Sequence, residues 1–171
     1  MRRIRDQFAV KLRTSAGHMF RGEFGDPNAY PRPRKEVQNL PHRALVTSLG
    51  AVVKAGDLVH FAGTHYLLCG QHTLSKTKRF LAVEINKTVT WTRMAEVIDP
   101  VTQMKKDTVA ETLDAALKVT LEPQRSFEEA NFTKSQRRVF TAADVKEGDE
   151  LDGMKVLRVD DLFGIRVAEV A

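Results

Sequence analysis

The sequence predicts a mainly β protein built from one or two small barrels of the SH3 or OB type, with an extended N-terminal arm and at most one short helix. Three observations lead to this prediction: short segments of alternating residues, glycines placed to turn hairpins, and a Gly-Asp motif that occurs twice. The chain has 171 residues, enough for one domain or two very small ones. No run approaches the roughly 18 apolar residues of a spanning helix, so we expect no membrane contact.

Residues 1–43 are expected to form an extended, basic N-terminal arm. Seven glycines and prolines interrupt this stretch, although the alternation of Phe8, Val10 and Leu12 predicts a short strand within it. Ten basic and four acidic residues lie in this arm, against 17 and 18 in the remainder of the chain. Such asymmetry indicates contact with nucleic acid or an acidic partner, the alternative being a solvated mobile terminus. The candidate contact residues are Arg2, Arg3, Arg5, Arg32, Arg34 and Lys35.

The remaining residues, 44–171, have the pattern of short strands and tight turns, and they divide into two candidate halves, 44–104 and 116–171. Leu58–Phe61 and His65–Cys69 are expected to pair as a hairpin that turns at Gly63. Further strands are expected at Phe80–Ile85, Thr88–Thr92 and Arg138–Phe140. We expect Asp99-Pro100 to interrupt the chain and Glu128–Thr133 to form a turn.

The segment 108–122 has two competing patterns. Thr108 and Glu111 have the spacing of a capping box, which favours a helix. Leu117, Val119 and Leu121 alternate with polar residues, which favours a strand. Our prediction is a short helix or turn at 108–115 that passes into a strand at 116–122, and the choice between helix and strand stays open.

A short motif occurs twice in the chain. Val53-Lys54-Ala55-Gly56-Asp57 recurs as Val145-Lys146-Glu147-Gly148-Asp149, and a hairpin is expected after each copy. Glycine accepts the positive φ of a tight turn, and aspartate caps free backbone donors. The motif therefore predicts β-barrel architecture, while duplication remains one interpretation, because such turns are common in β proteins. The structural turn residues are Gly56, Asp57, Gly63, Gly148, Asp149 and Gly153.

Two segments, Leu49–Leu68 and Phe140–Asp149 with Gly153 after it, resemble the head-closure (stopper) proteins of tailed bacteriophages. The resemblance implies a structural subunit of the phage neck, a homo-oligomeric ring that joins or seals the portal or adaptor ring to tail proteins. Viral DNA in the channel would be a further partner. The protein would be located in the virion after assembly in the host cytoplasm. The chain is long for this family and has two barrel-like halves, so adaptor, tail-completion and capsid-decorating roles stay open.

No catalytic or metal-binding pattern emerges from the sequence. The spacing of His60, His65, Cys69 and His72 matches no standard zinc frame, and Cys69 follows an apolar run, which predicts a buried, inert thiol. Phosphate-binding glycine loops and a Gly-x-Ser-x-Gly motif are absent from the sequence. We therefore expect no enzyme, no metal and no cofactor.

The main alternative from another class is a small β-barrel that binds nucleic acid. Basic residues stand beside an aromatic residue at Lys76-Thr77-Lys78-Arg79-Phe80 and at Arg137-Arg138-Val139-Phe140, a pairing suited to phosphate contact and base stacking. Against this alternative stand the aromatic content of 7% and the nearly neutral charge beyond the arm.

Overall fold

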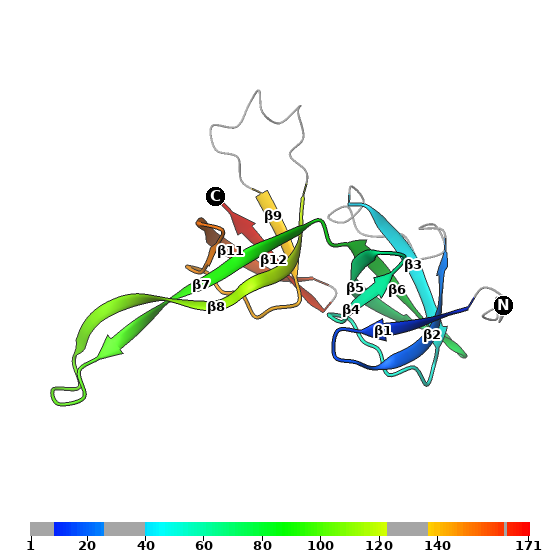
Figure 1. Ribbon diagram of the computed structural model, residues 1–171, viewed down its shortest axis with the longest axis horizontal. Helices are drawn as coiled ribbons and strands as arrows, with labels where there is room; N and C mark the ends of the chain where they lie inside the picture. Colours follow the sequence, from blue (N-terminus) through cyan, green and yellow to red (C-terminus); the bar gives the residue numbers. More distant parts are fainter. Residues whose placement is uncertain (1–8, 26–39, 123–136, 163) are drawn as a thin grey trace, which may run out of the picture.

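The structure, a computed structural model, describes residues 9–25, 40–122, 137–162 and 164–171. All regular secondary structure in these residues is β, in twelve strands. The strands close into two antiparallel barrels that lie side by side (Figure 1). The prediction of a mainly β protein with small barrels is therefore confirmed. Within the described part of the chain, no helix is long and apolar enough to cross a membrane.

Each barrel contains six strands that are consecutive in the sequence. The first barrel consists of β1 Val10–Thr14, β2 Met19–Gly25, β3 His42–Ser48, β4 Leu58–Phe61, β5 Thr64–Thr73 and β6 Thr77–Glu84. The second consists of β7 Lys87–Ile98, β8 Lys105–Leu121, β9 Arg137–Thr141, β10 Glu150–Leu151, β11 Met154–Leu162 and β12 Ile165–Val170. Around the first barrel the order is β1-β2-β3-β6-β5-β4, and around the second it is β7-β8-β9-β12-β11-β10. The second barrel thus repeats the topology of the first, strand for strand.

The repeated Gly-Asp motif forms the same turn in both barrels. In each copy the backbone N–H of the lysine donates to Oδ2 of the aspartate, at 2.9 Å for Asp57 and 2.8 Å for Asp149. The motif glycines have φ values of +90° and +88°, which glycine adopts without steric cost. Their N–H groups donate to the carbonyls of Leu68 at 2.7 Å and Val156 at 2.9 Å. The turn is therefore hydrogen-bonded to the second strand of the hairpin that follows it, β5 in the first barrel and β11 in the second.

The hairpins after the two motifs also share their turn geometry. Ala62 and Gly63 have φ values of 50° and 83°, and Asp152 and Gly153 have 52° and 76°. Two consecutive residues with positive φ are typical of the type I′ turn, whose twist matches that of the flanking strands. These turns join β4 to β5 and β10 to β11.

The two barrels have separate interiors of different composition. Large side chains, including Phe20, Phe80 and Tyr66, fill the first interior together with leucines. Valines dominate the second, namely Val89, Val119, Val139, Val145, Val156 and Val170. The same topology is thus packed with aromatic and leucine side chains in one barrel and with smaller β-branched ones in the other.

A third apolar cluster joins the barrels. Phe140 of β9 is fully buried among Leu67, Leu81 and Val83 of the first barrel, and Ile165 of β12 belongs to the same cluster. Hydrogen bonds cross the same boundary: the Thr120 hydroxyl donates to the Glu84 carbonyl at 2.8 Å. The Asn86 amide exchanges two bonds with the backbone of Leu121, at 2.7 and 2.8 Å. The two barrels therefore pack as one unit.

The expected arm at residues 1–43 requires correction. Val10–Thr14 and Met19–Gly25 are strands of the first barrel, and β1 closes it by pairing with β4. One of the glycines that suggested an arm is a packing residue, because a Cβ on Gly22 would lie 2.9 Å from Leu45 Cδ1. The barrel region thus begins before residue 44.

The expectations for the middle of the chain are also corrected. Residues 108–115 are neither helix nor turn but the central part of β8, which pairs with β7 along most of its length. The barrels meet between Glu84 and Lys87, so the boundary is not between residues 104 and 116. The capping-box pattern was overridden by cross-strand hydrogen bonds to a partner strand.

Candidate functional site

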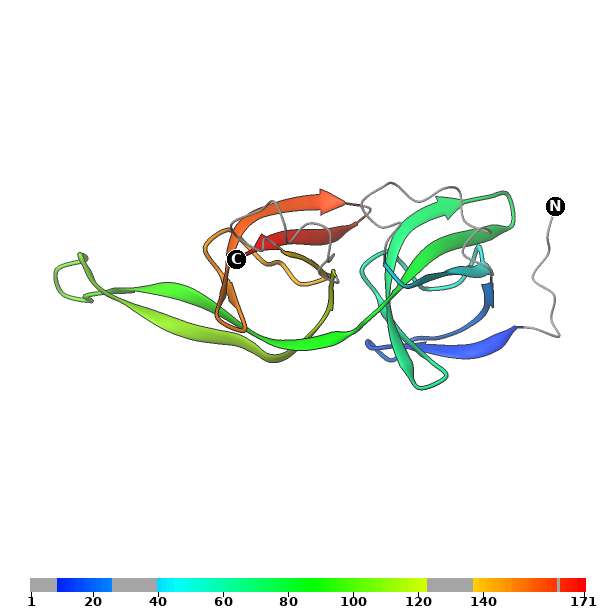
Figure 2. The ribbon, with the colours of Figure 1, turned by 90° about the horizontal axis from the view of Figure 1, so that it is seen from above.

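The most distinctive feature of the molecule is the outer part of the β7–β8 hairpin, Met94–Asp114, which we call the hairpin extension. It projects from the second barrel, away from the first (Figures 1 and 2). Within the described residues, β7 pairs with β10 only at Trp91 and Thr92, and β8 pairs with β9 only at Thr120 and Leu121. Beyond these contacts the two strands pair only with each other, over about 20 Å of β7 at the usual rise per residue.

The hairpin extension is unusually apolar for an exposed ribbon. It contains seven of the eleven large apolar side chains that are exposed in the described chain: Met94, Val97, Ile98, Val101, Met104, Val109 and Leu113. Met94 and Val97 lie three residues apart in the regularly paired part of β7, so their side chains point to opposite faces, and they are 51% and 40% exposed. Both faces of the ribbon therefore present apolar surface to the surroundings, which is typical of an interaction site.

The tip of the hairpin extension is a hydrogen-bonded turn. Asp99 Oδ1 accepts the N–H groups of Val101 at 2.8 Å and Thr102 at 3.2 Å, and these bonds lower the pKa of Asp99. Next to the turn, Lys105 Nζ lies 2.6 Å from Glu96 Oε1. The Asp99-Pro100 break predicted from the sequence is thus the turn that connects the two long strands.

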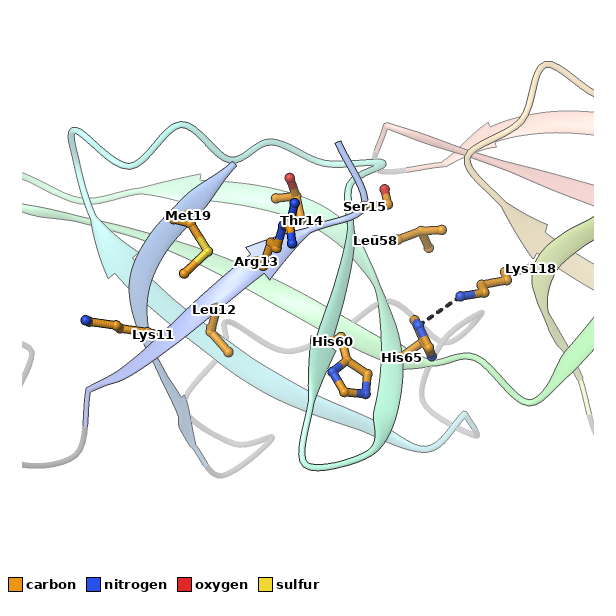
Figure 3. Close-up of a pocket in the computed structure, with 10 residues that line it drawn as sticks. All are labelled: Lys11, Leu12, Arg13, Thr14, Ser15, Met19, Leu58, His60, His65 and Lys118. Atoms are coloured by element: carbon orange, nitrogen blue, oxygen red, sulfur yellow. Dashed lines mark hydrogen bonds between the residues drawn. The ribbon is translucent and has the colours of Figure 1, made fainter. Parts of the chain in front are cut away.

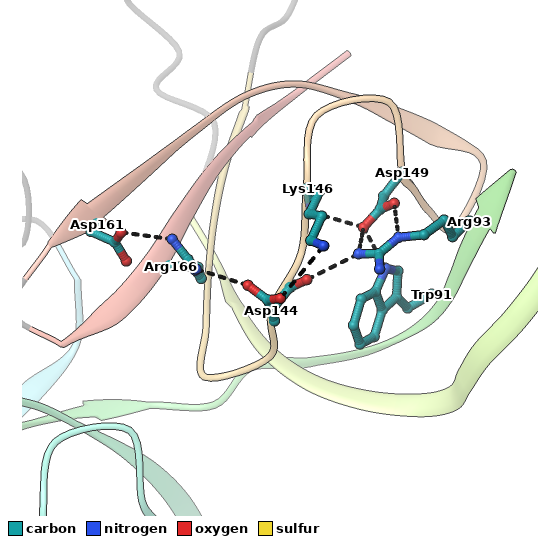
Figure 4. Close-up of polar contacts among 7 residues, drawn as sticks. All are labelled: Trp91, Arg93, Asp144, Lys146, Asp149, Asp161 and Arg166. Atoms are coloured by element: carbon teal, nitrogen blue, oxygen red, sulfur yellow. Dashed lines mark hydrogen bonds and ion pairs between the residues drawn. The ribbon is translucent and has the colours of Figure 1, made fainter. Parts of the chain in front are cut away.

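The base of the hairpin extension is held by Asp149 of the second Gly-Asp turn (Figure 4). The Asp149 carboxylate, 2% exposed, accepts the Trp91 indole N–H at 2.8 Å and the Arg93 guanidinium at 2.7 and 2.9 Å. The guanidinium also lies over the Trp91 ring, 5.4 Å from its centroid. Burial opposes ionisation of Asp149, but the bonds from Arg93, the Lys146 backbone and Trp91 outweigh it and lower the pKa. β7 is therefore fastened where it leaves the barrel.

Among the described residues of the first barrel, no equivalent of this anchor is found. Val59 lies two residues after Asp57 and pairs with Thr14 of β1. Leu151 lies two residues after Asp149 and pairs with Trp91 of β7. Thr14 therefore occupies in the first barrel the position that Trp91 occupies in the second. β1 ends at Thr14, whereas β7 continues through Arg93. Sequence reasoning identified Asp149 only as a turn residue and missed its two partners. The available signal was the Trp-x-Arg spacing, which places both side chains on one face of a strand.

A second ion-pair group stabilises the loop before β10 (Figure 4). Arg166 of β12 contacts Asp144 at 2.8 Å and Asp161 at 2.6 Å, and Arg93 donates to the Asp144 carbonyl at 3.0 Å. The carboxylates of both ion pairs are well exposed, so these pairs contribute little to stability individually. They fix the loop that carries Asp149.

A cationic hollow of about 490 Å³ lies on the first barrel, where it meets β8 (Figure 3). Its lining contains no carboxylate and consists of Lys11, Leu12, Arg13, Thr14, Ser15, Met19, Leu58, His60, His65 and Lys118. The strand register places Arg13 beside His60 and His60 beside His65. Lys118 of the second barrel then contacts His65, with 2.8 Å between Nζ and Nε2. Basic side chains thus lie next to one another on β1, β4 and β5, and Lys118 of β8 continues the series across the barrel boundary.

The protonation of His65 follows from this arrangement. Burial, then Lys118, then His60 lower its pKa, so the imidazole is neutral at pH 7. Nε2 accepts from the Lys118 ammonium, which leaves the ring proton on Nδ1. The hollow therefore presents the basic side chains of Lys11, Arg13 and Lys118 beside a neutral imidazole.

The remaining candidates from the sequence lie as follows. Arg2, Arg3, Arg5, Arg32, Arg34 and Lys35 lie outside the described residues. Cys69 is buried, and burial raises its pKa to about 12, so it stays a neutral thiol. The rings of His60 and His65 are 4.9 Å apart, but no group of three metal-binding side chains forms within the described chain.

The chain matches no protein-family model, no curated protein and no solved structure.

Proposed function

We propose that this protein is a structural subunit of an oligomeric assembly, and that the assembly is the neck of a tailed bacteriophage, where it joins or seals head to tail. The observation that carries the structural role is the hairpin extension, which exposes apolar side chains on both faces. The neck location rests on the resemblance of the motif segments to head-closure proteins.

A free two-stranded ribbon is marginally stable in water, and exposed apolar surface adds a risk of aggregation. A neighbouring subunit that covers the hairpin extension would remove both problems. The anchor of Trp91 and Arg93 on Asp149 supports this role, because it fixes the direction in which the extension leaves the barrel. A protein that contacts its neighbours in this way needs neither a catalytic group nor a cofactor.

A trimmed variant tests the structural role. Arg93 and Glu111 face each other in the hairpin, so Met94–Ala110 can be replaced by Asn-Gly, a two-residue type I′ turn. The parent should form rings in negative-stain electron microscopy and native mass spectrometry, and the trimmed variant should be monomeric with an unchanged melting temperature. A trimmed variant that assembles like the parent would overturn the role.

The neck location is tested separately in purified phage particles. The chain should be detected in them by mass spectrometry, and density for its two barrels should occur at the vertex where the tail meets the head. Particles that lack the chain would overturn the location without affecting the structural role.

A second candidate function, nucleic-acid binding, is favoured by the charge of the first barrel. Its described residues include eight basic and three acidic side chains, whereas those of the second barrel include eleven and fourteen. A nucleic-acid module should bind short DNA strands with an affinity that falls steeply as salt rises. Fluorescence anisotropy of labelled oligonucleotides at two salt concentrations distinguishes the two functions.

A further inference from the structure

We propose that the cationic hollow of one copy receives the hairpin extension of a second copy, so that the chains associate head to tail. This inference rests on the proposed structural function and goes further, because it names the partner of the hairpin extension. Three features of the described residues support it: charge, apolar surface and the positions of the two sites.

The charges of the two sites are complementary. The hairpin extension contains five acidic residues and two lysines, and one of these lysines, Lys105, already pairs with Glu96. Asp107 forms no ion pair with any described residue, whereas Glu111 faces Arg93 across the hairpin and interacts with its charge without forming a close ion pair. Lys11 and Arg13 in the hollow likewise lack an acidic partner in the described chain, and no carboxylate lines the hollow. Opposite charges of this kind steer association and fix its register.

The apolar surfaces of the two sites are also matched. Met19, which is 62% exposed, and Leu58 stand among the cations of the hollow. The hairpin extension carries Met94, Val97 and Ile98 near its carboxylates. Contact between the two sites would bury this apolar area and exclude water from the ion pairs, which strengthens them. A phosphate backbone would satisfy the cations but would leave the methionine and leucine without a partner.

The positions of the two sites favour contact between copies over contact within one copy. The hairpin extension points away from the first barrel, which carries the hollow (Figures 2 and 3). Two complementary patches at different places on one molecule make a heterologous contact, which closes into a ring when the rotation between copies permits it. The contact therefore accounts for a ring without a second kind of subunit.

Charge reversal on each side tests the inference. The hollow variant carries Lys11→Glu and Arg13→Glu, and the extension variant carries Asp107→Lys and Glu111→Lys. Each should lower the self-association constant by at least about tenfold in sedimentation velocity at physiological salt. An equimolar mixture of the two variants should recover association, because the acidic hollow of one accepts the basic extension of the other.

Lys155→Glu, a reversal at an exposed position of β11, is the matched control and should associate like the parent. Melting temperatures show whether each variant is folded. If the trimmed variant is monomeric but the reversals leave association unchanged, the docking inference fails and the structural role stands. If the trimmed variant assembles normally, both fail. A hollow variant that assembles normally but loses binding to a DNA oligonucleotide would assign the hollow to nucleic acid and overturn the inference.

Discussion

The two barrels share one topology and one Gly-Asp turn, yet they differ in the hairpin formed by their first two strands. β1 and β2 have five and seven residues and end within the barrel, whereas β7 and β8 have twelve and seventeen and extend beyond it. The first barrel shows that closure of this topology does not require the longer hairpin. The additional length of β7 and β8 is therefore not needed for closure, and we propose that it serves contacts outside the barrel.

The two barrels also differ in the contacts of their motif aspartates and in the composition of their interiors. The Asp57 carboxylate accepts one backbone N–H in its turn, whereas the Asp149 carboxylate also binds Trp91 and Arg93 at the base of the hairpin extension. The first barrel is filled by aromatic and leucine side chains and carries the cationic hollow. The second is filled by valines and carries the projecting hairpin. The two barrels thus present different surfaces on the same topology.

The largest expected effect comes from deleting residues 1–43. The deletion removes β1, β2 and the start of β3, so the first barrel cannot close and should unfold. Near-UV circular dichroism and amide proton dispersion by NMR should report this loss. The trimmed hairpin variant, which shortens the corresponding strands of the second barrel, should remain folded. A folded deletion variant would show that the first barrel does not depend on its first two strands.

Phe140→Ala should have the next largest effect, because this side chain belongs to the second barrel but is buried against the first. Removing a buried phenylalanine side chain costs about 3–5 kcal/mol. We expect the single unfolding transition of the parent in urea to shift strongly or to split into two. Leu157→Ala, at a residue that is 44% exposed, is the control and should be nearly neutral. An unchanged midpoint for Phe140→Ala would mean that the barrels are stabilised independently.

Asp149→Asn should destabilise the protein by about 2–3 kcal/mol at pH 7, because it removes the charged partner of Arg93. The pKa of Asp149 is lowered in the folded chain, so its stabilisation is present above the unfolded pKa and is lost as pH falls through the folded value. The difference between parent and variant should therefore narrow below about pH 4. Urea unfolding of the parent and the variant from pH 3 to pH 7 measures this difference in the free energy of unfolding. Asp57→Asn should lower the free energy of unfolding by less at pH 7. Equal effects of the two substitutions would contradict the difference between the two aspartates.

Gly153→Val and Gly63→Val should each cost about 1–2 kcal/mol, the smallest of these effects. Both glycines have positive φ in equivalent turns, and a Cβ at either meets nothing within 4 Å, so only backbone strain opposes the substitution. Thermal melts of the two variants should therefore show similar decreases. A Gly153→Val variant that melts like the parent would mean that the turn tolerates the strain.

Much of the candidate site lay beyond prediction from the sequence. Asp99-Pro100 and the alternation around Trp91 predicted a turn and a strand, but nothing local showed that β7 and β8 pair far outside the barrel. The hollow was equally hidden, because Arg13, His60, His65 and Lys118 come from four strands and are adjacent only through the register.

The sequence by itself determined the class of fold, the Gly-Asp turns, the glycine-turned hairpins and the burial of Cys69. These features depend on residues within a few positions of one another, through positive φ, side-chain capping and alternation. Only the tertiary structure decided that residues 10–25 close a barrel, that residues 108–115 are strand, and that Asp149 holds Trp91 and Arg93. Each of these depends on pairing or packing between segments far apart in the chain, which outweighs local preference once the hydrogen bonds and apolar contacts form.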